Sequence, residues 1–116
     1  MYWESILQSI KKLLGIPESD EAFDAELIAH INGVFMTLHQ LGVGTSAGFF
    51  ISGPQEIWSD FVDNDHLLET VRMFIYLKVR MIFDPPTSSA AAEAINSRIA
   101  ELEFRLNVQA EGDAES

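Results

Sequence analysis

Two adjacent prolines, Pro85 and Pro86, constrain the fold of this chain more than any other feature. They follow residues 65–83, whose apolar side chains cover nearly every face of a helix and so predict a central helix. Proline disfavours the helical conformation at the preceding residue and lacks an amide hydrogen, so this helix must end near Phe83. Hydroxyl side chains at positions 87–89 can cap a following helix. The sequence therefore predicts a rigid corner between two helices.

Three further segments, residues 3–14, 20–41 and 89–106, repeat apolar residues at helical spacing. Ser19 or Asp20 can cap the second of these helices. The glycine-rich residues 42–64 carry no helical pattern. We therefore expect an all-α fold, a small four-helix bundle with a long irregular loop or a small hairpin between its second and third helices.

The end of the chain loses this pattern. After Leu106 the apolar stripe of the last helix stops, so residues 107–109 are expected to fray until a partner orders them. We divide the chain into a helical domain, residues 1–109, and an acidic C-terminal tail, residues 110–116.

Composition excludes several classes of function. The formal charge is −11, from 18 acidic and 7 basic residues, which argues against binding to nucleic acid or to an anionic membrane surface. The most apolar stretch, residues 73–83, is too short to span a membrane and contains Lys78 and Arg80. The chain has no cysteine, so disulfides and cysteine-based zinc sites are excluded.

No motif predicts catalysis. Residues 44–48 match the G-x-S-x-G pattern around Ser46, but that motif needs a preceding strand in a large α/β sheet. The three histidines, at positions 30, 39 and 66, are not spaced as a zinc pair on one helical face. We predict a helical interaction protein, not an enzyme, with no cofactor and no metal.

Two sets of residues are candidates for contacts with other chains. Arg72, Lys78 and Arg80 lie on a helix with few polar positions and need carboxylate partners from another helix or another subunit. Residues 44–58 are expected to project from the helical body. The side chains expected to touch a neighbour there are Phe49, Phe50, Ile51, Pro54 and Trp58.

Five stretches together resemble the head–tail connector proteins of long-tailed bacteriophages, also called adaptor or head-completion proteins. The stretches are residues 9–16 (SIKKLLGI), 39–44 (HQLGVG), 58–61 (WSDF), 76–89 (YLKVRMIFDPPTSS) and 101–109 (ELEFRLNVQ).

The resemblance implies a helical virion protein in the neck, assembled in the host cytoplasm. It implies a ring, expected to be a dodecamer, that extends the DNA channel beneath the portal and carries the next neck or tail-completion protein. DNA would pass without specific binding, and no catalysis or cofactor is implied. The family usually docks on the portal through its C-terminal segment, which here would be Arg105, Leu106, Asn107, Val108 and Gln109.

Three alternatives follow from the residues alone. An acidic mimic of DNA would need carboxylates spaced like phosphates, whereas the acids here are scattered. A small helical regulatory protein would act as a monomer or dimer. A hydrolase using Ser46 is the weakest of the three.

Overall fold

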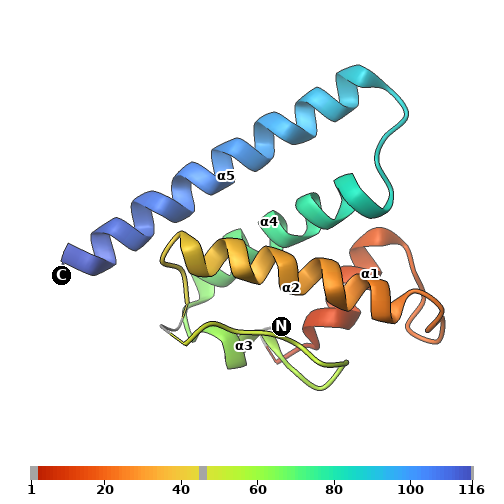
Figure 1. Cartoon of the computed structure of the whole chain (residues 1–116), viewed down its shortest axis with the longest axis horizontal. Helices are drawn as coiled ribbons and strands as arrows, with labels where there is room; N and C mark the ends of the chain where they lie inside the picture. Colours follow the sequence, from red (N-terminus) through yellow and green to blue (C-terminus); the bar gives the residue numbers. More distant parts are fainter. Residues whose placement is uncertain (1–2, 45–46, 116) are drawn as a thin grey trace.

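The computed structural model describes residues 3–44 and 47–115, which contain five α-helices and no strand (Figure 1). The all-α prediction is confirmed, with one short helix that the sequence did not predict. In place of a hairpin, the described residues show a single isolated antiparallel bridge between Ser5 and Ile57. The helices are α1 (Ile6–Leu14), α2 (Asp24–Gln40), α3 (Trp58–Phe61), α4 (Asp65–Phe83) and α5 (Ser89–Glu115).

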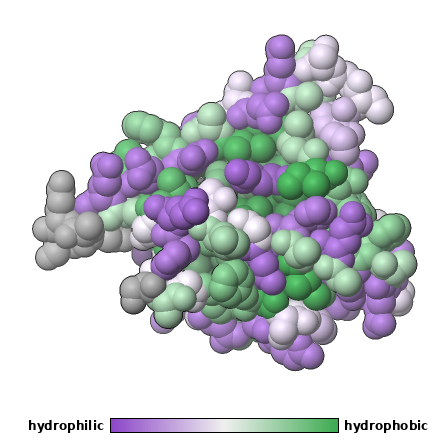
Figure 2. Space-filling view, in the orientation of Figure 1, coloured by the Kyte–Doolittle hydropathy of each residue, from purple (hydrophilic) through white to green (hydrophobic). Residues whose placement is uncertain are grey.

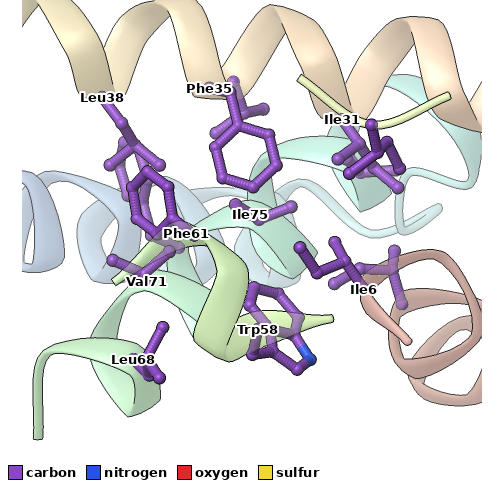
Figure 3. Close-up of a cluster of buried hydrophobic side chains, with 14 of the residues drawn as sticks. Ile6, Ile31, Phe35, Leu38, Trp58, Phe61, Leu68, Val71 and Ile75 are labelled. Carbon is purple, nitrogen blue, oxygen red and sulfur yellow. The ribbon is translucent and has the colours of Figure 1, made fainter. Parts of the chain in front are cut away.

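Helix α4 is central, as its pattern predicts, because α1, α2 and α5 all pack on it. On the face that Figure 2 shows, apolar side chains form separate patches between polar ones. The main apolar cluster is internal, where side chains from α1, α2, α3 and α4 converge (Figure 3). The labelled members are Ile6, Ile31, Phe35, Leu38, Trp58, Phe61, Leu68, Val71 and Ile75.

The predicted corner between α4 and α5 is present. Helix α4 starts after Asn64, whose Oδ1 accepts a hydrogen bond from the Leu67 amide at 3.1 Å, and it ends at Phe83. The Ser88 hydroxyl then accepts a hydrogen bond from the Ala91 amide at 3.0 Å. Proline sterics and a hydroxyl cap therefore fix both sides of the corner.

Helix α2 begins at Asp24, four residues later than predicted. Asp20 does not cap the helix; its side chain accepts a hydrogen bond from the Ala22 amide. The backbone carbonyls of Asp20 and Glu18 accept hydrogen bonds from Lys11 Nζ, at 2.7 and 3.2 Å. A tertiary contact thus holds the residues before Asp24 in a turn.

Helix α5 continues to Glu115, so the prediction that it ends near Leu106 is wrong. Leu106 is buried, and Ala110 packs against the core beside Gly42. No helix-breaking residue intervenes before Gly112. The buried stripe is therefore longer than the sequence pattern indicated, because small Ala110 meets a glycine.

Several contacts hold the segment between α2 and α3 against the helices. Asn32 Nδ2 donates a hydrogen bond to the Ile51 carbonyl at 2.9 Å, and the Ile51 amide donates to Asn32 Oδ1 at 2.8 Å. Phe49 packs edge-on against Phe35 and Phe61, with ring centroids 5.1 and 5.4 Å apart. The expectation that this whole segment projects is corrected: its described part lies mostly against the helices.

Candidate interaction surfaces

Lys11, in the last turn of α1, is a completely buried cation that the sequence analysis did not single out. Its Nζ lies 2.9 Å from Asp24 Oδ1 and also donates to two backbone carbonyls. The sequence contained a signal for this burial, because Lys11 follows Leu7 by four residues and so lies on the apolar face of α1.

The three cations predicted at a subunit interface are half-buried and lie on two sides of α4. Arg72 pairs with Glu69 of the same helix at 3.1 Å. Lys78 Nζ lies 5.4 Å from the centroid of the Phe74 ring. Arg80 donates a hydrogen bond to the Tyr76 hydroxyl at 3.4 Å. Neither Lys78 nor Arg80 forms an ion pair with a carboxylate of the described residues.

One of these sides forms a surface that we call the α4 stripe. Its members recur at helical spacing and are exposed or half-buried: Glu69, Arg72, Met73, Tyr76 and Arg80. At its C-terminal end, Tyr76 and Arg80 line a hollow of about 300 Å³ together with Lys12 and Leu13 of α1. Lys12 is exposed and, within residues 3–44 and 47–115, also has no carboxylate partner in an ion pair.

Helix α5 presents a second surface, the α5 outer stripe, on the side away from its buried residues. It consists of the exposed residues Glu93, Ser97, Glu101, Phe104 and Val108. Phe104 is 69% exposed and Val108 49% exposed, and the two lie one helical turn apart on this side of α5. Glu101 lies within the same helix between Arg98 and Arg105, at 3.2 and 2.6 Å.

The five residues predicted to dock on the portal differ in exposure. Leu106 is buried in the core, although it also lines one hollow together with Arg105 and Gln109. Asn107, Val108 and Gln109 are exposed, and Gln109 lines a hollow of about 350 Å³ beside Asn64 and His66. Arg105, also exposed, is held by Glu101.

The five predicted loop contacts differ in exposure in the same way. Ile51 and Trp58 are buried in the core of their own chain, and Phe49 packs against it. Phe50 and Pro54 are exposed. Phe50 lines a mostly apolar hollow of about 150 Å³ between α2 and residues 47–50, which we call the phenylalanine hollow.

The described part of the chain offers no group of three or more His, Cys, Asp or Glu side chains that could hold a metal ion. Within those same ranges, no helix is both long and apolar enough to cross a membrane. Ser46 lies outside the described residues.

Comparison with known proteins gives one family. No curated protein sequence and no solved structure matches the chain. The sequence profile of the family described as "Phage connector protein" matches residues 6–113, which include all five helices almost completely. The resemblance to head–tail connectors is thereby confirmed. Because the match covers nearly the whole chain, the protein belongs to the phage connector protein family and is a head–tail connector.

Proposed function

We propose that copies of this chain form a ring, expected to be a dodecamer, beneath the portal vertex in the neck of the virion. The ring would assemble in the host cytoplasm, extend the DNA channel and join the head to the next neck or tail-completion protein. The observation that carries the proposal is the long outer side of α5, which the monomer leaves uncovered although it includes Phe104 and Val108. Two large apolar side chains one turn apart can serve as anchors for a partner.

The charge of the chain fits a DNA channel. With 18 acidic and 7 basic residues, a ring of these subunits carries a strongly negative field. Such a field repels the phosphates of DNA, so the duplex can pass without specific contacts. The role is structural and requires no cofactor and no catalytic group.

We assign portal docking to the C-terminal part of α5, from Arg105 to Gln109 and the helical residues that follow. The contact would be made by Asn107, Val108 and Gln109, with Arg105 offering charged hydrogen bonds beside them. Leu106 would instead hold this part of α5 on the core. Figure 1 supports this assignment, because the C-terminal end of α5 extends to one end of the molecule.

The phenylalanine hollow is the surface we assign to the next neck protein. Phe50 is 55% exposed at its rim, and Met36 of α2 beside it is 54% exposed. An exposed apolar rim around a small apolar hollow suits an apolar side chain of a partner. Pro54 lies exposed on the same connecting segment.

The test of portal docking is a substitution and not a truncation. A chain ending before Leu106 would lose a buried side chain and unfold part of the core, which would obscure any loss of docking. Val108→Asp changes only an exposed position. It should weaken co-purification with portal protein about tenfold or more, with unchanged helical content by circular dichroism.

The matched control is Ile82→Asp, which makes the same kind of change at an exposed residue at the C-terminal end of α4. This variant should bind portal as the unmodified protein does. If Val108→Asp also binds portal normally, docking lies elsewhere. If the unmodified protein remains a monomer or dimer and never binds portal, the ring proposal fails and a regulatory role becomes the better account.

A further inference from the structure

The α4 stripe and the α5 outer stripe point to opposite sides of the molecule. Helix α5 covers the side of α4 that carries Leu67 and Thr70, since these residues line one hollow together with Leu106. With 3.6 residues per turn, the α4 stripe lies roughly 140° around the helix from that side. The α5 outer stripe lies opposite Leu102 and Leu106, which face α4. Two different surfaces on opposite sides are what a head-to-tail contact between identical subunits needs.

The two stripes are also chemically complementary. The α4 stripe carries Arg72 and Arg80, with Lys12 beside it, in a chain that has only seven basic residues. The α5 outer stripe carries Glu93 and Glu101, of which Glu101 is already paired with Arg98 and Arg105 of its own helix. Both stripes expose apolar groups next to these charges, namely Met73 and Leu13 on one side and Phe104 on the other.

We propose that the α4 stripe of one copy binds the α5 outer stripe, from Glu93 to Phe104, of a neighbouring copy. This contact rests on the ring proposed above and names the two surfaces that close it. Val108 lies one turn beyond Phe104, outside this contact, and is left for the portal. One helix thus serves two partners along its length.

The spacing of the charges supports this pairing. Arg72 and Arg80 are eight residues apart, as are Glu93 and Glu101, which places each pair about 12 Å apart along its helix. Within one chain α4 and α5 run in opposite directions (Figure 1). Neighbours in a twelvefold ring differ by a rotation of only about 30°, so α5 of one copy stays antiparallel to α4 of the next.

An antiparallel arrangement assigns the partners. It puts Arg80 beside Glu93 of the neighbour and Arg72 beside the neighbour's second glutamate, at position 101. Arg72 and Glu101 both have partners in their own helices, namely Glu69 for the arginine and Arg98 and Arg105 for the glutamate. These pairs lie at the surface and contribute little to stability, but they make this the weaker of the two proposed contacts. Arg80 and Glu93 form no ion pair within the described residues. Inside its own chain Arg80 donates one long hydrogen bond to the Tyr76 hydroxyl and lines a hollow with Asp84, so the neighbour's Glu93 would have to compete with these groups.

A charge exchange tests the Arg80–Glu93 pair. Mass photometry or native mass spectrometry would count the copies bound to a purified portal ring. Arg80→Glu and Glu93→Arg should each lower the affinity between copies about tenfold or more, because like charges then face each other. The double variant R80E/E93R should recover assembly. Asp63→Arg, which reverses an exposed acid between α3 and α4, is the control and should assemble normally.

Mixing provides a second readout that does not depend on the double variant. In a mixture of the R80E and E93R single variants, an alternating ring contains only opposite-charge pairs. The mixture should therefore assemble when neither variant assembles alone. Circular dichroism and thermal melting of each variant show whether the monomers are folded.

The outcomes separate this inference from the proposed function. If the unmodified protein forms a ring on the portal and either single variant does so equally well, the ring stands and these surfaces are wrong. If both single variants fail but neither the double variant nor the mixture recovers, the proposed pairing is wrong. If the unmodified protein forms no ring with portal, the proposed function and this contact both fail.

Discussion

The Nζ atom of Lys11 lies 2.9 Å from Oδ1 of Asp24, and the lysine side chain is fully buried between α1 and the turn before α2. This ion pair connects the first two helices. It also explains where α2 starts, because the same ammonium group holds the carbonyls of Glu18 and Asp20.

Removing the carboxylate should destabilise the protein strongly. Asp24→Ala leaves a buried ammonium group without its counter-charge, which should lower the free energy of unfolding by about 3 kcal/mol. Lys11→Met instead leaves the Asp24 carboxylate unpaired, but that side chain is 23% exposed at a helix N-terminus and can be hydrated, so this substitution should cost less. Lys12→Met, at the exposed neighbour, is the control. Urea denaturation followed by circular dichroism measures all three, and a larger loss for Lys11→Met than for Asp24→Ala would contradict the explanation.

Trp58 should depend on Ser9 for its indole hydrogen bond. Trp58 Nε1 donates to Ser9 Oγ at 3.0 Å, and that hydroxyl donates onward to the Ser5 carbonyl at 2.6 Å. Ser9→Ala leaves the buried indole N–H without an acceptor, at a cost of about 1–3 kcal/mol.

Urea denaturation followed by circular dichroism measures this loss, because it also follows the variants that lack Trp58. The exposed control Ser59→Ala should change stability by no more than about 0.5 kcal/mol. In a Trp58→Phe background, Ser9→Ala should cost clearly less, because no indole N–H remains to be satisfied. An equal cost in both backgrounds would show that the indole hydrogen bond is not responsible.

The connecting segment should be protected from hydrogen exchange at Ile51. Its amide donates to Asn32 Oδ1, and the Asn32 amide group donates back to the Ile51 carbonyl. Asn32→Ala removes both bonds and should speed exchange at the Ile51 amide about tenfold or more, while amides in the middle of α4 stay unchanged. Rapid exchange at Ile51 in the unmodified protein would restore the expectation that this segment projects freely.

Glu56 should make the stability of this segment depend on pH. Burial raises the pKa of Glu56, but hydrogen bonds from the side chain and amide of Ser52 and from the amide of Gly53 outweigh it, so the pKa is lowered. A lowered pKa in the folded state contributes stability above the ordinary glutamate pKa of about 4.3, and this contribution is lost as pH falls through the folded value.

Glu56→Gln cannot ionise and should therefore remove this dependence. The difference in unfolding free energy between the unmodified protein and Glu56→Gln should be constant near pH 6–7 and shrink below about pH 4.3. Urea denaturation at a series of pH values measures it. A difference that grows with acidity would contradict the assigned direction of the shift.

Some features of this protein were determined by the sequence alone. The end of α4 at Phe83 and the corner after it follow from proline sterics and a hydroxyl cap, which act between neighbours along the chain. The apolar pattern of residues 65–83 likewise predicted that α4 is central. The family, too, was accessible from short stretches of sequence, and the match to residues 6–113 confirms it.

Other features were decided only by the tertiary structure. The burial of Lys11 and the start of α2 depend on the contact between Lys11 and Asp24, which lie on either side of a turn. The continuation of α5 depends on Gly42, which Ala110 contacts. The burial of Ile51 and Trp58 depends in the same way on Asn32 and Ser9. Local sequence fixes backbone angles and helix caps, whereas the burial of a side chain depends on which residues from distant parts of the sequence pack against it.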